Sequence, residues 1–586
     1  MQIIKSIIKL TVFLCPIFAT AQSVTLPQSD KAEHFLDRID IKQQSNYDLI
    51  LAADKPLERK IAARVATGTD SLNKLYPSSQ SYSLSKVDQY NLHSLLINNI
   101  EWADSGLDGV LSKHALFNTF YIQKTNFYEV NQKDFFLAVN PVIQEIQGHE
   151  TGDSSGKSFS NSVYLNSRGV SLRGMVANKL GFSAYLTDNQ EGVPLYVRKI
   201  DTVNGYPFVP GEGYWQTFKN TGYDYFDNRA SIYFNAWKYF DFQFGYDKNF
   251  IGDGYRSLFL SDNSAPYLFL KFNMRIWKLD YQTIYMQLVG QHAIGNDLYP
   301  QKFGVIHDLH INATKWLSVG FFENVMFSRA DHFDFTYLNP TVFLISQQQQ
   351  DGSADKTTAG LDFKANIAHS VQLYGQLLFN EFILDQIIHY SRGFWANKQG
   401  LQFGVKYIDA FKVKNLDLQA ETNIVRPFTY SSHDTVTNYS NYNQPMADPL
   451  GANFDEFIGI CRYQPINKLT LEGRLIYYRQ GLDSAGKDFG SNILTNYNDR
   501  VTDTLIENGT PTAVQRDYGY KIGSGILAQC VNAYFSASYE VKENVFVDLS
   551  MQYRIYKVSA EQSLNNNSTM FSIGLRWNAF KRVYDY

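Results

Sequence analysis

A period-two alternation of apolar and polar residues recurs along this chain from Asp134 onward, and it limits the possible folds more than any other feature. In "VFVDLSMQYRIYKV", Val547 and Leu549 point to one side of a strand, whereas Asp548 and Gln552 point to the other. The segments "KLTLEGRLIYY" and "KNLDLQAETNI" repeat this pattern. A soluble sandwich would show the same alternation, so the connections between the strands have to distinguish the two folds.

These connections alternate between short and long. Short turns occur at "ANK", "AWKY", "RIWK", "NATK", "IAHS", "FKVKN", "PINK" and "VKEN", and the other gaps are generally longer and polar. The runs give about eighteen strands, with about eight tight turns on one side and about nine loops on the other, as bacterial outer-membrane barrels require. The sequence thus predicts an all-β transmembrane barrel of about 18 antiparallel strands, whose two ends both lie on the periplasmic, tight-turn side.

The composition agrees with a barrel and excludes a helical membrane protein. Aromatic residues make up 15% of the chain, with 40 Tyr and 42 Phe, which is far above ordinary usage. The mean hydropathy is −0.29, and no run of about 18 to 20 apolar residues follows the N-terminus. A search for long apolar runs does not detect barrel strands, because they are apolar on only one face.

The first 21 residues have the features of a secretory signal peptide. Two lysines precede an apolar run from Leu10 to Phe18, and a small-x-small cleavage site ends at Ala21. We do not expect lipidation at Cys15, because large apolar residues precede it. The chain is therefore expected in the outer membrane of a Gram-negative cell.

The mature chain offers no sign of a nucleic-acid partner. Loss of the two signal-peptide lysines changes the formal net charge from −4 to −6, so there is no basic surplus to bind phosphates. Two cysteines remain, Cys461 and Cys530. They either pair in an oxidising compartment or are separate apolar residues of the strands.

Residues 22–130 have a helical period instead. "DKAEHFLDRIDIK" places its apolar residues on one face, and Ser85 with Asp88 three positions later is typical of a helix start. We expect a small helical segment in the periplasm. The outer-membrane barrel then comprises residues 131–586.

Three segments carry a family resemblance: "GYDKNFIGDGYRSLFLSDNSAPYLFLKF" from Gly245, "GFWANKQGLQFGVKY" from Gly393 and "NIVRPFTYSSHDTVTNYSNYNQPMADPLGANFDEF" from Asn423. They resemble the capsule-assembly Wzi-like family of outer-membrane proteins, in the Bacteroidetes branch that includes the gliding-motility protein RemB. The resemblance implies an eighteen-stranded barrel with a periplasmic helical bundle. It also implies lectin-like binding of surface polysaccharide, or alternatively a role in gliding.

Catalytic and metal motifs are weak throughout the sequence. "GDSSGKS" is one residue short of a phosphate-binding loop, and G-x-S-x-G, H-E-x-x-H and C-x-x-C do not occur. "DKNFIG" begins like a calcium loop, but Ile251 and Leu258 stand where oxygen ligands are needed. We therefore expect a protein that is not an enzyme and that has no cofactor and no metal.

The polar loops supply aromatic rings that stack on sugars, and planar polar groups that pair with hydroxyls. The candidate polysaccharide-binding residues are Trp215, Asp253, Tyr255, Arg256, Asp262, Asn263, Arg392 and Trp395. The alternative is that the aromatics pack the loops over the barrel mouth and that Arg256 pairs with a lumen acid such as Asp247. The Gly245 to Pro266 connection is expected to organise the extracellular face.

The expected function is binding or organising surface polysaccharide at the cell exterior, without catalysis. The expected partners are outer-membrane lipid, capsule or exopolysaccharide, and motility or secretion machinery. A gliding-motility surface protein and a solute porin are the alternatives. Because the loops are longer than hairpin closure needs, we expect the pore to be largely blocked.

Overall fold

The structure is a computed structural model that describes residues 23–586 apart from short gaps. The gaps are 28–29, 51–52, 104–106, 108, 113–116, 118, 153–160, 178, 201–206, 220, 238, 292–298, 382–384, 387–389, 485 and 508–509. The expected signal peptide lies outside the described residues.

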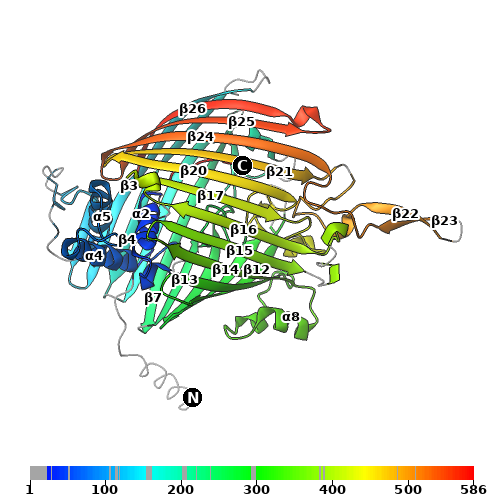
Figure 1. The fold of residues 1–586 in the computed structure, drawn as a ribbon, viewed down its shortest axis with the longest axis horizontal. Helices are drawn as coiled ribbons and strands as arrows, with labels where there is room; N and C mark the ends of the chain where they lie inside the picture. Colours follow the sequence, from blue (N-terminus) through cyan, green and yellow to red (C-terminus); the bar gives the residue numbers. More distant parts are fainter. Residues whose placement is uncertain are drawn as a thin grey trace, which may run out of the picture.

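Eighteen antiparallel strands close into a barrel within the described part of the chain, which confirms the predicted fold class (Figure 1). The barrel closes where the last strand pairs with the first. In chain order the strands are β3 (Phe135–Thr151), β4 (Ser162–Val176), β5 (Leu180–Gly192), β7 (Gly222–Trp237), β8 (Phe240–Asp247), β10 (Tyr267–Ile276), β11 (Leu279–Val289), β12 (Gln301–Asn312), β13 (Leu317–Phe327), β14 (Lys356–Ile367), β15 (Val371–Glu381), β16 (Lys398–Tyr407), β17 (Leu416–Val425), β20 (Phe454–Ile466), β21 (Leu469–Leu482), β24 (Ile526–Lys542), β25 (Val545–Val558) and β26 (Asn566–Trp577).

The two ends of the barrel differ as the sequence predicts. One end, here called the turn end, carries the tight hairpins, and the other, the loop end, carries the longer connections. Further short strands lie outside the 18 strands of the barrel. They are β2 (Tyr128–Gln132), β6 (Gln216–Phe218), β18 (Ser440–Asn441) and β19 (Gln444–Pro445), and β22 (Thr502–Glu507) with β23 (Thr510–Gln515), a hairpin that projects from the loop end (Figure 1).

The alternation of side chains sets the two faces of the wall. On β25, Leu549 and Tyr553 are 51% and 45% exposed on the outside, whereas Gln552 and Arg554 are buried inside. This pattern gives a lipid-facing exterior and a polar interior. Cys461 is exposed and Cys530 is buried, and both are free thiols, so the possibility that they pair is excluded.

The described part of the N-terminal segment forms four α-helices, α2 (Asp30–Gln43), α3 (Tyr47–Ile50), α4 (Arg59–Leu75) and α5 (Lys86–Asn98). Their apolar faces meet in a small core that includes Phe35, Ile39 and Leu92. Ser85 and Asp88 form the predicted capping box at the start of α5. None of the described helices is long and apolar enough to cross a membrane. The helices lie at the turn end (Figure 1).

Candidate functional site

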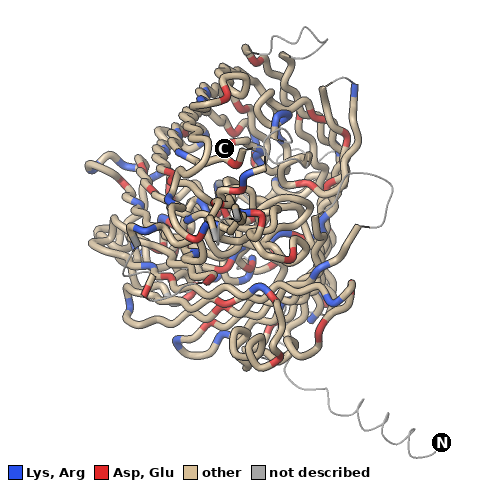
Figure 2. The backbone as a smooth tube through the Cα atoms, turned by 90° about the vertical axis from the view of Figure 1, so that its right-hand side faces the viewer, with Lys and Arg blue, Asp and Glu red and all other residues tan. Residues whose placement is uncertain are grey.

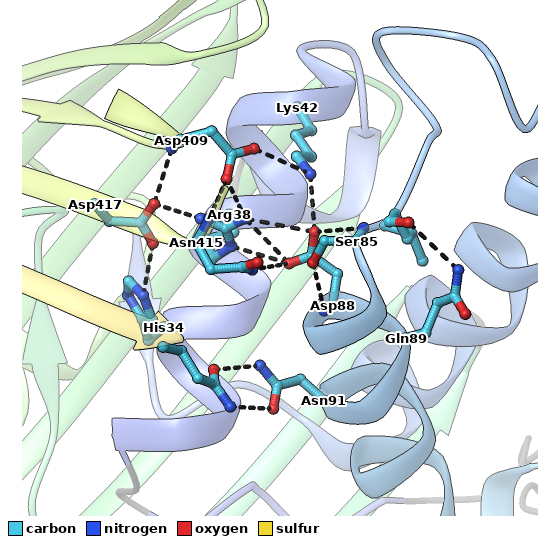
Figure 3. Close-up of polar contacts among 12 residues, drawn as sticks. His34, Arg38, Lys42, Ser85, Asp88, Gln89, Asn91, Asp409, Asn415 and Asp417 are labelled. Carbon is cyan, nitrogen blue, oxygen red and sulfur yellow. Dashed lines mark hydrogen bonds and ion pairs between the residues drawn. The ribbon is translucent and has the colours of Figure 1, made fainter. Parts of the chain in front are cut away.

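A buried ion-pair network fixes the helical segment to the turn end of the barrel (Figure 3). The Arg38 guanidinium on α2 lies 3.1 Å from a carboxylate oxygen of Asp88 and 2.9 Å from one of Asp409, and it also contacts Asp417 on β17. Lys42 donates to Asp88 at 2.9 Å. Burial raises the pKa of Asp88, but the charges of Arg38 and Lys42 outweigh it and hold that pKa below its usual range. The helices are therefore held electrostatically as well as by packing.

Further contacts extend the docking surface around the turn end. Lys31 and Tyr90 both donate to the Glu540 carboxylate at the end of β24, at 2.7 Å and 2.9 Å. On the other side Lys406 of β16 lies 2.6 Å from Asp37. A short strand, β1 (Asp54–Lys55), pairs with β9 (Phe250–Ile251), which belongs to a loop from the opposite end. The N-terminal segment and that loop thus meet inside the barrel.

The connection between β8 and β10, which is predicted to organise the extracellular face, runs into the lumen. Its apolar residues Leu258, Phe259 and Leu260 are completely buried. The backbone N–H groups of Tyr255 and Arg256 donate to the Glu421 carboxylate on β17 at 2.6 Å and 3.0 Å. These donors and apolar side chains find their partners on the inner wall, which draws the loop inward.

Gly254 permits this close approach to the wall. A Cβ at this position would lie 2.7 Å from a Glu421 carboxylate oxygen and 2.7 Å from the Arg256 carbonyl oxygen. Any side chain would force the loop away from β17. A second loop, residues 426–453, packs on the first: the Tyr430 and Tyr439 hydroxyls donate to the carbonyls of Leu258 and Phe259, each at 2.7 Å. The loop half of the lumen is therefore packed.

The residues after β26 also turn into the lumen, where the chain ends within the barrel outline of Figure 1. Asp585 lies 3.1 Å from the Arg256 guanidinium and 3.0 Å from that of Arg474. Arg582 reaches Glu212 at 2.6 Å. The period-two pattern of the last strand gives no sign of this turn, so sequence reasoning missed these residues.

Arg256 is one of the predicted site residues, and the structure makes it the centre of an ion-pair cluster. It pairs with Asp585 and with Glu456, at 3.3 Å, rather than with the suggested lumen acid Asp247. Asp247 instead faces Arg229 at 3.8 Å. The idea of a structural ion pair is thus supported, with different partners.

A cavity of about 420 Å³ remains between the loop, the C-terminal residues and α2. The predicted residues Tyr255, Arg256, Asp262 and Asn263 line it. Its walls carry both signs of charge. From the loop end, Figure 2 shows basic and acidic residues mixed through the interior, with no region of one sign. The arrangement suits closure by internal pairing better than attraction of one class of ion.

The other predicted residues lie apart from this cavity. Asp253 is turned toward the wall, where its carboxylate pairs with Lys364 at 2.9 Å. Trp215 packs edge-on against Tyr223, with ring centroids 4.7 Å apart. Arg392 is exposed in the loop after β15. The eight candidates therefore do not form a single site.

Trp395 lies in a group of rings and charges at the loop end, here called the loop cluster. The loop cluster comprises Glu381, Trp395, Lys398, His433, Tyr497 and Arg500. The Trp395 and Tyr497 rings are 5.0 Å apart, and the Lys398 ammonium lies 3.9 Å from the centre of the Tyr497 ring. The Arg500 guanidinium lies 4.2 Å from the Trp395 ring centre. Rings and planar charged groups from four separate parts of the chain thus share one small surface.

Several members of the loop cluster remain accessible. His433 is exposed, Glu381 has a 41% exposed side chain, and Trp395 and Tyr497 are half-buried. Sequence reasoning found Trp395 but missed Lys398, Tyr497 and Arg500. Their only signal was aromatic and basic residues in polar loops, and nothing local shows which loops meet.

The comparisons with known proteins bear on the fold. No family model matches the chain, and no curated protein matches it by sequence. Among solved structures, Wzi from Escherichia coli matches with a TM-score of 0.53 over 96% of this chain and 100% of that chain, at 12% identity. The chain has the Wzi barrel fold. Wzi is described as an outer-membrane protein involved in group 1 capsule assembly and as a carbohydrate-binding β-barrel.

Two further barrels match less completely. OprD from Pseudomonas aeruginosa has a TM-score of 0.38 at 8% identity, over 75% of this chain and 94% of that chain. OccAB2 from Acinetobacter baumannii has a TM-score of 0.39 at 9% identity, over 75% of this chain and 98% of that chain. The likeness to Wzi spans both chains almost completely.

Proposed function

We propose that this chain is a non-enzymatic outer-membrane barrel that binds surface polysaccharide, capsule or exopolysaccharide, through the loop cluster. In this proposal the turn end and the helices face the periplasm, and the loop end faces the cell exterior. The observation that carries the proposal is the contact of Trp395 and Tyr497 with each other and with Lys398 and Arg500 at the loop end, where Lys398 also pairs with Glu381.

The chemistry of this surface suits a sugar chain. The CH faces of a pyranose pack on aromatic rings, and its hydroxyls pair with carboxylate and guanidinium groups. Glu381 is held by Lys356 at 2.8 Å and Lys398 at 3.2 Å, so its accessible carboxylate is fixed in place. A preorganised surface of this kind loses little conformational entropy when a ligand binds.

Two further observations support the proposal. The fold shared with Wzi spans nearly the whole chain, and Wzi itself is described as a carbohydrate-binding barrel. The lumen is occupied by the chain itself from both ends, which favours a surface role over passage of solutes. Arg392, also at the loop end, is an additional candidate contact.

The test is binding of purified surface polysaccharide to the detergent-solubilised protein. We expect the double variant Trp395→Ala/Tyr497→Ala to weaken binding roughly tenfold or more, because truncation of buried aromatic contacts commonly costs more than about 1 kcal/mol each. Tyr214→Ala removes a 50% exposed aromatic from another loop and is the matched control. Trp395→Phe, which keeps a ring, should retain most of the affinity.

Folding is checked in each variant by heat-modifiable migration in gels. A folded double variant with wild-type affinity would contradict the loop cluster as the binding site. Loss of binding in Tyr214→Ala to the same degree would contradict it as well, because the effect would then not be specific to this surface.

A further inference from the structure

Three metal-ligating side chains converge where the N-terminal segment meets the barrel wall. Asp54 lies on β1, and Asp308 and His310 lie two positions apart on β12, so both point inward from the same strand. One ligand atom from each residue lies within 4.8 Å of the others. These atoms come from parts of the chain that are about 250 residues apart.

Three carboxylate oxygens in this group have no hydrogen-bond partner. Asp308 is completely buried, yet neither of its carboxylate oxygens accepts a hydrogen bond, and the same holds for Oδ1 of Asp54. Among the described residues, no Lys or Arg lies within ion-pair distance of Asp54 or Asp308. The His310 imidazole is the basic group within ion-pair distance of Asp308. A buried carboxylate without a hydrogen bond is costly, so its oxygens are expected to bind a ligand.

The position of the His310 imidazole supports a bound cation as well. Its Nε2 atom lies 2.7 Å from Oδ2 of Asp308, but neither atom has a partner in hydrogen-bond geometry. Two atoms that bind one ion at about 2.0 to 2.2 Å lie about 3 Å apart without sharing a proton. The separation of these two atoms fits two ligands of one cation.

The other ring nitrogen of His310 is placed as metal-binding histidines require. Nδ1 faces Oδ1 of Asp362 on β14 at 3.5 Å, across the intervening strand β13. Gly320 of β13 makes room for this approach: a Cβ there would clash with the Asp362 carboxylate and would lie 2.6 Å from the His310 ring. A carboxylate behind the ring orients it and directs Nε2 to the ion.

Space for additional ligands adjoins the cluster. A cavity of about 60 Å³ is lined by Asp54, Lys271 and Gln282 among others. That volume accommodates the one or two waters that would complete a coordination shell. The neighbouring Asp280, opposite His310 on β11, is engaged by Arg275 and is not needed as a ligand.

We propose that Asp54, Asp308 and His310 form a structural site for a divalent first-row transition-metal ion of the Zn²⁺ type. Two carboxylates and one imidazole suit such an ion, whereas Ca²⁺ and Mg²⁺ prefer oxygen ligands alone. The ion joins β1 of the N-terminal segment to β12 of the wall. It therefore holds the helical segment in place within the barrel. The proposal is independent of polysaccharide binding.

The experiment is a Zn²⁺ titration of chelator-stripped, detergent-solubilised protein in competition with a chromogenic chelator. We expect one tight equivalent per chain in the wild type, and its loss in Asp308→Asn and His310→Gln. Asp362→Asn keeps all three ligands and should weaken binding about 10- to 100-fold. His332→Gln removes an exposed histidine from a loop outside the site and is the control that should bind as the wild type does.

A second readout separates metal loss from misfolding. In the wild type, chelator should accelerate proteolysis within residues 54–98 and Zn²⁺ should reverse the effect, while heat-modifiable migration of the barrel stays unchanged. In Asp308→Asn this segment should be cleaved at one rate with or without chelator. A folded wild type that holds no more Zn²⁺ than the Asp308→Asn/His310→Gln double variant would overturn the proposal, as would wild-type affinity in either single variant.

Discussion

At the scale of single residues, the lumen is organised by buried arginines that each neutralise more than one carboxylate. Arg256 is 9% exposed and joins the β8–β10 loop to Glu456 on β20 and to Asp585. Arg474 adds a second contact to Asp585. Such a residue connects three parts of the chain, so its loss removes a cation from more than one buried carboxylate.

We expect Arg256→Ala to destabilise the protein by about 3 to 5 kcal/mol, because Glu456 would remain buried without its cation and Asp585 would keep Arg474 alone. The unfolding temperature from heat-modifiable migration measures this change. Arg479→Ala is the control, since Arg479 is half exposed and pairs with Asp455 at the surface, and should change stability by less than about 1 kcal/mol. Polysaccharide binding should persist in Arg256→Ala, because the residue lies outside the loop cluster. Equal effects of the two variants would contradict this account.

Lys248, in the same loop, predicts a pH dependence. Burial, together with the neighbouring Arg229 charge, lowers the pKa of Lys248 from 10.5 to about 8. The unfolded chain therefore binds more protons between pH 8 and 10.5, and the folded state gains stability as the pH rises through that window. Below about pH 8 the lysine is charged in both states and its burial is fully unfavourable.

The measurement compares wild type and Lys248→Met from pH 7 to 10.5. The stability of the variant relative to the wild type should be greatest at pH 7 and should fall by up to about 3 kcal/mol across the window. The Lys248 ammonium also donates to the Asp262 carbonyl at 3.2 Å, a hydrogen bond that the variant lacks. A difference that does not vary with pH would contradict the assignment.

At the scale of elements, the position of the docked helices against the barrel is what local sequence predicts least. Each helix has its own apolar face, but the segment is positioned by ion pairs between α2, α5 and the ends of barrel strands. A segment held in this way can be released without unfolding the barrel, because the strands keep their own ladder of hydrogen bonds.

Arg38→Ala tests this separation. Loss of the guanidinium leaves Asp88 and Asp409 with Lys42 as their shared cation and leaves Asp417 with His34, and we expect the helices to undock at a cost of about 3 to 5 kcal/mol. Limited trypsin digestion should then cut α4 and α5 faster while the barrel stays resistant to detergent.

Arg64→Ala is the matched control for this test. Arg64 belongs to the same helical segment and pairs with Asp48, but its side chain is 57% exposed and makes no described contact with the barrel. Its loss should therefore leave the digestion pattern unchanged. Intact helices in Arg38→Ala would show that packing alone holds them.

At the scale of the whole molecule, a barrel wide enough for a pore is filled by its own chain. The helices close the turn end, the loops 248–266 and 426–453 pack the loop end, and residues 578–586 enter between them. We expect reconstituted wild-type protein to conduct poorly in a planar bilayer. Steady conductance of the size that open porins show would contradict the closed lumen and favour solute transport.

Sequence alone determined the wall of this molecule. The alternation in β17 and β25 and the positions of the tight turns follow from local rules, because each strand residue faces either lipid or the interior and each turn joins neighbours. The capping box at Ser85 is equally local. Each of these features needs only residues that lie close together in the chain.

Tertiary structure decided which segments fill the lumen and which residues come together as candidate sites. The inward course of the β8–β10 loop depends on Glu421, and the meeting of Asp54 with His310 depends on a fold that brings remote segments together. Likewise Trp395 gains Tyr497 as a neighbour only when two long loops converge. The physical reason is that a local pattern specifies which face a side chain occupies, whereas its partner there is chosen by hydrogen bonding, charge and packing among residues that the sequence does not place together.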